Sequence, residues 1–185
     1  MALKSTIYKA ELNIADMDRG VYASPAVTLA LHPSETEERL MARLLAYALH
    51  LPADELNGTL QFAKGLSDVD EPDLWHKDYA DQILHWIEVG QPDERRLGKA
   101  SSRAERVTIV SYAASTPIWF DGLVNRISRY SNLEIWQLPV EQSVALSRLA
   151  QRSMRWQVSV QDGWVWVNSG DDTVEIQLQR LFPSA

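Results

Sequence analysis

Residues 83–90, ILHWIEVG, form an apolar run of strand length that one charged residue, Glu88, interrupts. Two more strand-like runs follow, RVTIVSYA at 106–113 and LEIWQLP at 133–139, and a helical segment lies in each interval. The order strand, helix, strand, helix, strand is typical of parallel strands joined by crossovers. The sequence therefore predicts an α/β fold, in which helices flank a mixed central sheet and the strand at 83–90 lies inside it.

Both ends of the chain show the period of two that half-buried strands have. Residues 5–15 and 21–31 alternate around the turn sequence DMDRG, which predicts an N-terminal hairpin whose second strand is delayed or held at an edge by Pro25. Residues 154–181 alternate around turns such as Asp162-Gly163, which predicts an antiparallel meander. We expect these terminal strands to pair with one another and to extend one side of the sheet that holds Glu88.

The clearest helix lies within residues 32–51, HPSETEERLMARLLAYALHL. Ser34 and Glu37 match a capping box at its start. The helix then presents one apolar stripe, formed by Leu40, Met41, Leu44, Leu45, Ala48 and Leu49. A second helix is expected after residue 91, because Pro92, Asp93 and Glu94 suit a first helical turn.

Composition limits the classes of protein and of metal site. A chain of 185 residues with 45% hydrophobic and 23% charged residues predicts one globular domain, residues 1–185. It contains no apolar run of about 20 residues that could span a membrane, and its start lacks a secretory pattern, so we expect a cytoplasmic protein. The absence of cysteine excludes disulfides, thiolate zinc sites and iron–sulfur clusters. A metal site would therefore use oxygen or histidine ligands, which favours magnesium, manganese or calcium.

Glu88 is the most informative polar position, because a carboxylate inside a doubly buried strand needs compensation. It requires a metal ion, a cationic partner or a raised pKa. The alternative to a functional role is a structural ion pair with a basic residue, and the candidates are Arg39, Arg95, Arg96 and Lys99.

Two other acidic elements are candidates for the same site. Glu38 lies beside the apolar stripe of the first helix; the alternative role, compensation of the helix dipole, suits Glu35 and Glu37 better than Glu38. The segment DVDEPDLW, residues 68–75, is acidic and equally suits a solvated loop. Within it, Asp73 follows Pro72 at the expected start of a strand, and Trp75 lies on the same strand face.

Common catalytic motifs are missing from the sequence. It contains no GxxxxGK[ST], GxGxxG or GxSxG pattern, and its four histidines lack the spacing of a zinc motif. A net charge of −7 argues against indiscriminate binding to nucleic acid, but a local basic groove is compatible with it.

Several segments together resemble the YaeQ family of bacterial proteins. They are HPSETEERLMARLL, FAKGL, DEPDLW and WIEVGQPDERRLGKA, and the similarity extends from TIYKAELNIAD to QDGWVW. The resemblance implies a single YaeQ-like domain that is a variant of the PD-(D/E)XK nuclease-like fold, with its core at about residues 34–138. That core consists of a helix, a three-stranded meander, a helix and a strand.

The resemblance also implies roles for particular residues. Glu38 would be the carboxylate of the helix, and Glu88 would be the (D/E) residue of the motif. Asp73 would be the PD aspartate, and Asp70 and Glu71 are competitors for that role. The motif lysine is replaced by Gly90, so Lys99 would act as a migrated lysine, with Arg95 and Arg96 as alternative cations.

The chemistry implied is that of a metal-dependent nuclease or phosphodiesterase acting on nucleic acid. Asp73 and Glu88 would hold Mg²⁺ or Mn²⁺, and Glu38 and Lys99 would complete the catalytic set. The substrate would contact the side chains of Gln91, Arg96 and Trp75. The alternative, favoured by Gly90 and the acidic net charge, is a non-catalytic binding or regulatory protein with a protein partner. Neither function requires a membrane, and the sequence leaves open whether the protein is an enzyme.

Overall fold

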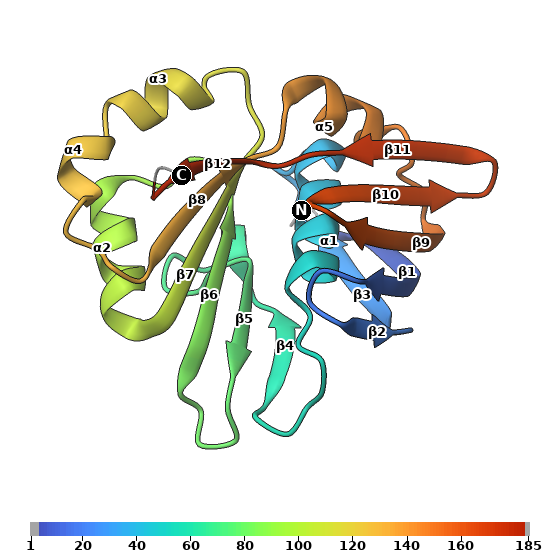
Figure 1. Ribbon diagram of the computed structural model, residues 1–185, viewed down its shortest axis with the longest axis horizontal. Helices are drawn as coiled ribbons and strands as arrows, with labels where there is room; N and C mark the ends of the chain where they lie inside the picture. The colour runs from blue at the N-terminus through green and yellow to red at the C-terminus, as the bar shows by residue number, and fades with distance from the viewer. Residues whose placement is uncertain (1–3, 184–185) are drawn as a thin grey trace. The chain divides into compact units, whose positions relative to one another are not determined.

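The computed structural model describes residues 4–183, which form two mixed β-sheets and five α-helices (Figure 1). These residues divide into two compact units. Unit 1 comprises residues 4–53 and 141–177, and unit 2 comprises 54–140 and 178–183. Each unit contains one sheet, so the expectation of one continuous sheet is wrong. None of the helices within residues 4–183 has the length and apolar character needed to cross a membrane.

Neither unit is a continuous piece of chain. The backbone passes from one unit to the other at residues 53–54, 140–141 and 177–178. That residues 1–185 form a single domain therefore stays a prediction.

The sheet of unit 1 contains the predicted hairpin and the predicted meander. Its strands lie in the order β11-β10-β9-β1-β2, and β3 also pairs with β1. Pro25 falls in the break between β2 and β3, which are both antiparallel to β1. The two ends of the chain meet through a parallel pairing of β1 with β9. The strand bounds are β1 (Thr6–Asp16), β2 (Val21–Ala23), β3 (Ala26–Leu31), β9 (Ser153–Gln161), β10 (Trp164–Ser169) and β11 (Asp172–Ile176).

Helix α1 (Glu37–His50) packs against β1 and β3 of the same unit. The expected stripe is buried at five of its six positions, and Leu49 is half-buried. The predicted capping box is wrong, because Thr36 is the N-cap and its hydroxyl accepts a hydrogen bond from the Arg39 N–H at 3.2 Å. The Glu37 carboxylate accepts from the Tyr8 hydroxyl at 2.6 Å instead.

Unit 2 contains the sheet that the run from residue 83 predicts. Its order is β12-β8-β7-β6-β5-β4; β6, β7 and β8 are parallel, and the other pairs are antiparallel. The strand with Glu88, β6, lies between β5 and β7, so its predicted interior position is confirmed. The last part of the expected meander, residues 173–181, is divided between β11 and β12. The bounds are β4 (Thr59–Phe62), β5 (Leu74–Lys77), β6 (Ile83–Val89), β7 (Ala104–Ser111), β8 (Leu133–Gln137) and β12 (Gln179–Phe182).

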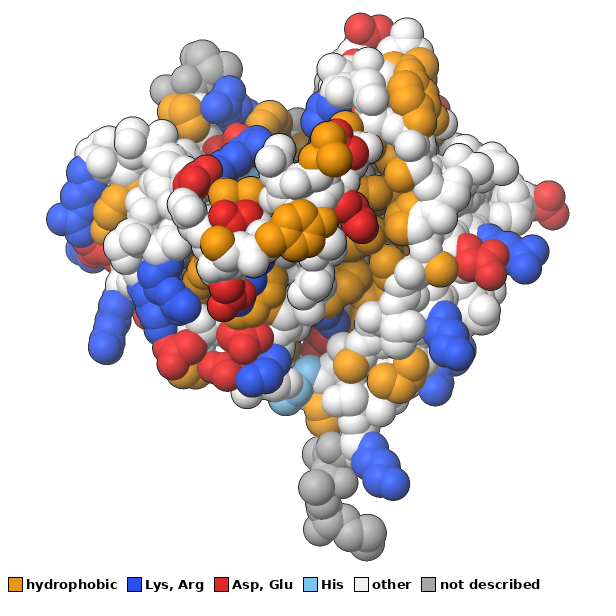
Figure 2. Space-filling view, turned by 90° about the horizontal axis from the view of Figure 1, so that it is seen from below, with side chains coloured by type: hydrophobic (Ala, Val, Ile, Leu, Met, Phe, Trp, Pro, Cys, Tyr) orange, Lys and Arg blue, Asp and Glu red, His pale blue; other side chains and the backbone are white. Residues whose placement is uncertain are grey.

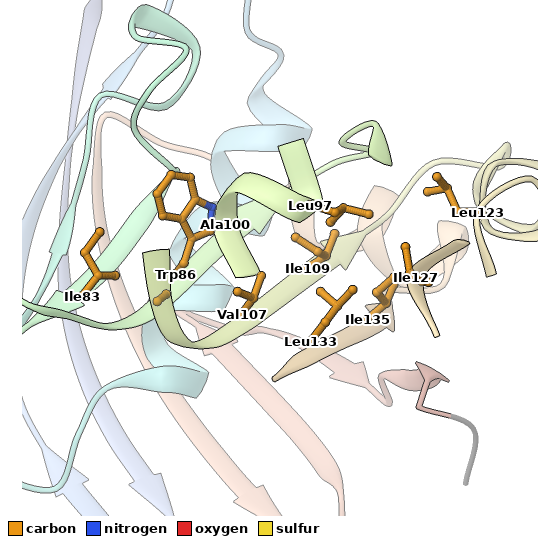
Figure 3. Packing of buried hydrophobic residues seen from close by; sticks show 11 residues of the cluster. Ile83, Trp86, Leu97, Ala100, Val107, Ile109, Leu123, Ile127, Leu133 and Ile135 are labelled. Carbon is orange, nitrogen blue, oxygen red and sulfur yellow. The ribbon is translucent and has the colours of Figure 1, made fainter. Parts of the chain in front are cut away.

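One apolar cluster fixes helix α2 (Glu94–Arg103) on the sheet of unit 2. Leu97 and Ala100 are the buried residues of this helix, and Figure 3 shows Leu97 next to Ile109 and Ala100 next to Trp86. The helix begins at Glu94 because the Asp93 carboxylate caps it, accepting from the Arg96 N–H at 2.8 Å. Two short helices, α3 (Thr116–Asp121) and α4 (Val124–Ile127), follow β7, and α5 (Val140–Ser147) lies mostly in unit 1.

Candidate active site

Asp73 and Glu88 come together at the carboxyl end of β6. The antiparallel register pairs Leu74 with Ile87, so Asp73, one residue before β5, stands opposite Glu88. The Asp73 Oδ2 accepts a hydrogen bond from the Val89 N–H at 2.8 Å. Only 3% of Asp73 and 5% of Glu88 is exposed. The structure thus brings together the two carboxylates that were predicted as metal ligands.

A single oxygen of Glu88 makes all its hydrogen bonds. Its Oε1 accepts from the Arg96 Nε at 2.6 Å and from the Trp86 Nε1 at 3.0 Å. Among residues 4–183, none donates a hydrogen bond to Oε2. Burial raises the pKa of Glu88 above its ordinary value and the charge of Asp73 adds to this, while the Arg96 guanidinium acts in the opposite direction. Of the basic residues considered as ion-pair partners, Arg96 is the one that contacts Glu88.

Arg96 also holds the loop that precedes Asp73. Its two terminal nitrogens donate to the carbonyls of Val69 at 2.6 Å and Glu71 at 2.8 Å. A guanidinium presents its donors in a planar fork, so these contacts and the Glu88 bond fix its orientation. Arg96 therefore joins α2, β6 and the loop at one point.

Two more basic side chains of α2 reach the same loop. The Lys99 ammonium pairs with the Asp70 carboxylate, and the Arg103 guanidinium donates to the Asp70 carbonyl at 3.0 Å. Arg103 was missing from the predicted site. The signal was present in the sequence, because residues 96, 99 and 103 are three and then four positions apart and so share one helix face.

The competitors of Asp73 point elsewhere. Asp70 is exposed, and the neighbouring Lys99 lowers its pKa. The Glu71 carboxylate accepts from the Lys64 backbone N–H at 3.0 Å and lies 3.4 Å from the Lys64 ammonium. Of these acidic residues, Asp73 is the one that is buried against β6.

The remaining predicted residues have separate environments. Trp75 stands opposite Trp86, packs against the apolar cluster and carries the Lys77 ammonium 3.8 Å from its ring centre. The exposed Gln91 amide donates to the Ser115 hydroxyl at 2.9 Å. Glu38 belongs to unit 1, where it accepts from the Ser143 hydroxyl at 2.7 Å. Its part in a site with Asp73 and Glu88 stays a prediction.

The donor chemistry of this pair fits a hard divalent cation. Asp73 and Glu88 offer carboxylate oxygens from neighbouring segments, and the Glu88 Oε2 is without a hydrogen-bond donor among the described residues. Magnesium and manganese prefer carboxylate oxygens, and magnesium retains several water ligands, so two protein ligands suffice.

Gly65, in a single 3₁₀ turn (Gly65–Ser67), is packed against Asp73. Its φ is +50°, and a Cβ there would lie 2.6 Å from the Asp73 Oδ1. We expect Gly65→Ala to cost about 1–2 kcal/mol of left-handed strain and about 1 kcal/mol more for disturbing the Asp73–Val89 hydrogen bond. Urea unfolding measures both losses.

Gly20→Ala is the matched control for that substitution. Gly20 has a φ of +68°, but a Cβ there would meet no atom within 4 Å. It therefore shares the backbone strain and lacks the contact. Equal losses of stability in the two variants would show that Gly65 does not support Asp73.

Comparison with known proteins confirms the resemblance seen in the sequence. The family model described as YaeQ protein matches residues 1–178. The uncharacterized protein YaeQ of Salmonella typhi is 44% identical, and that of Escherichia coli K12 is 42% identical, over 179 residues and 96% of each chain. The crystal structures of YaeQ proteins from Xanthomonas axonopodis pv. citri and Pseudomonas syringae each align with a TM-score of 0.89 at 44% identity. These alignments cover 95% and 97% of this chain, respectively, and 97% of each of those chains. The chain therefore belongs to the YaeQ family.

Proposed function

We propose that the protein is a divalent-metal-dependent phosphodiesterase acting on nucleic acid, with Asp73 and Glu88 as metal ligands. The observation that carries this proposal is the pairing of two buried carboxylates on neighbouring strands, with the Glu88 Oε2 accepting no hydrogen bond from residues 4–183. An acid at the start of one strand beside an acid on the next is also the arrangement that a variant of the PD-(D/E)XK fold would have.

The side chains around the pair have distinct parts in this proposal. A bound Mg²⁺ or Mn²⁺ would lower the pKa of a water ligand and offset the phosphate charge. Arg96 and Trp86 hold Oε1 of Glu88, which fixes the carboxylate and leaves Oε2 for the metal. Lys99 takes the part of the motif lysine. Gln91, Trp75 and Arg96 contact the substrate.

A metal titration of the full chain tests the proposal. We expect Mg²⁺ or Mn²⁺ to raise the unfolding temperature, since a ligand at 100 times its Kd stabilises the folded state by about 2.7 kcal/mol. We also expect hydrolysis of labelled single- or double-stranded DNA or RNA that depends on the metal and stops with EDTA. A protein that neither metal stabilises and that cleaves none of these substrates would refute it.

A non-catalytic binding or regulatory protein is the second candidate. Arg96, Lys99 and Arg103 are all engaged within the chain, and Gly90 stands where the motif has its lysine. On the face drawn in Figure 2, acidic and basic side chains are intermixed. Metal or nucleic-acid binding without hydrolysis would favour this candidate.

A further inference from the structure

The acidic loop, residues 68–71, lies along three basic side chains of α2. These side chains, Arg96, Lys99 and Arg103, are called the basic row here. Val69, Asp70 and Glu71 each offer a backbone carbonyl to a guanidinium of the row, and Asp70 also offers its carboxylate to Lys99. The row thus binds a short series of oxygen acceptors supplied by the chain itself.

A phosphodiester backbone offers the same kind of partner. It presents anionic oxygens at regular intervals, and guanidinium and ammonium groups bind such oxygens with charge-assisted hydrogen bonds. From Arg96 to Arg103 a helix rises about 10 Å. The row therefore presents three cationic side chains along one helix face, which matches a short run of phosphates in charge.

We propose that the basic row is the phosphate-binding track of the site, and that the acidic loop occupies this track until nucleic acid displaces it. The choice of ligand rests on the function proposed above. The track would place the backbone of the nucleic acid beside Glu88, because Arg96 contacts both that carboxylate and the loop.

The loop has the properties of a displaceable occupant. Val69 is 79% exposed and the Asp70 side chain 67% exposed, so the loop tip buries little apolar surface. Exposed ion pairs such as Lys99–Asp70 contribute little to stability. The row has other anchors, because Arg96 pairs with Glu88 and the Arg103 guanidinium lies 5.4 Å from the centre of the Trp86 ring.

Asp70→Asn tests the occupancy of the track. It removes the carboxylate charge that competes with phosphate for Lys99, so we expect the full-length variant to bind tighter by about two- to five-fold. Fluorescence anisotropy of a labelled 12-nucleotide single strand, in EDTA so that no metal-dependent cleavage occurs, gives the Kd. Glu94→Gln is the matched control, since Glu94 is also an α2 acid paired with basic residues, Arg126 at 3.4 Å and Arg129 at 3.5 Å.

Arg103→Gln tests the track from the basic side. We expect weaker binding, with the slope of log Kd against log salt reduced by about 0.7, the value for one phosphate contact on a single strand. Arg126→Gln removes the same charge from α4, outside the row, and we expect it to leave the slope nearly unchanged.

Together the four variants show whether nucleic acid and the acidic loop compete for the basic row. The proposal is overturned if the wild type does not bind the oligonucleotide, if Asp70→Asn and Glu94→Gln change the Kd equally, or if the two arginine variants have the same slope. The track stands and the phosphodiesterase proposal fails if the expected pattern appears in a protein that cleaves nothing. The phosphodiesterase proposal stands and the track fails if the wild type cleaves nucleic acid while all four variants bind it with the same Kd and salt slope.

Discussion

Arg96→Met is expected to lower the free energy of unfolding by about 3–5 kcal/mol at pH 7.5, the usual cost of removing one partner of a buried ion pair. Methionine keeps much of the apolar volume of arginine but leaves Glu88 charged, buried and bonded only to Trp86. The loss of two hydrogen bonds to the acidic loop adds to the cost. Urea unfolding of wild type and variant measures the difference.

The loss of stability caused by Arg96→Met should become smaller as the pH falls. Burial already raises the pKa of Glu88, and removing the Arg96 charge, which opposes that rise, moves it further up. A carboxyl group with a raised pKa binds its proton more readily in the folded state. The stability that this group contributes is therefore greatest below its pKa in the unfolded chain, about 4.3. That contribution is lost as the pH rises through the pKa of the group in the folded state. The gap between variant and wild type should therefore widen from pH 4.5 to pH 7.5.

Two further variants separate the ion pair from ordinary surface charge. Arg155→Met removes an arginine that pairs with Glu11 at 3.0 Å, where the two side chains are 85% and 65% exposed, and we expect a loss of at most about 1 kcal/mol. Adding Glu88→Gln to Arg96→Met should restore part of the stability, because the buried charge is then gone. If Arg96→Met costs no more than Arg155→Met at any pH, Arg96 does not neutralise a buried carboxylate.

Glu88→Gln is expected to reduce metal-dependent hydrolysis to background while costing less stability than Arg96→Met, about 1–2 kcal/mol. The amide retains an oxygen that accepts from Trp86 and Arg96, but it lacks the charge that binds a divalent cation. The stability cost is smaller because the cation left behind, with 27% of its side chain exposed and two carbonyl partners, is better solvated than a carboxylate with 6% exposed.

The measurements are hydrolysis and thermal unfolding, each with and without Mg²⁺. Glu94→Gln, the same chemical change on the surface of α2, should keep both the activity and the stabilisation by Mg²⁺. A wild type that Mg²⁺ does not stabilise, with a Glu88→Gln variant as unstable as Arg96→Met, would leave Glu88 as a structural ion-pair residue. That result would remove the main support for a phosphodiesterase.

Local patterns in the sequence determined much of the fold. The apolar run at 83–90 predicted the interior strand β6, the alternation at both ends predicted the hairpin and meander, and the stripe in residues 32–51 predicted the buried face of α1. The alternation has a period of two residues and the stripe a period of 3.6, which follow from backbone geometry, and a short apolar run is typical of a strand buried on both faces. The pairing of Asp73 with Glu88 was expected from the resemblance to the YaeQ family, with Asp70 and Glu71 as competitors for the place of Asp73.

Only the tertiary structure decided which distant segments meet. In the structure the terminal strands form a second sheet, and β12 pairs with β8 in the sheet of unit 2. Of the basic residues that could have paired with Glu88, Arg96 is the one that does. The tertiary structure also laid the acidic loop on the basic row of α2. Each of these choices depends on which partners bury the most apolar surface and satisfy the most charge across the whole chain. The local spacing of residues cannot predict which partners meet, because the alternative partners have the same local sequence pattern.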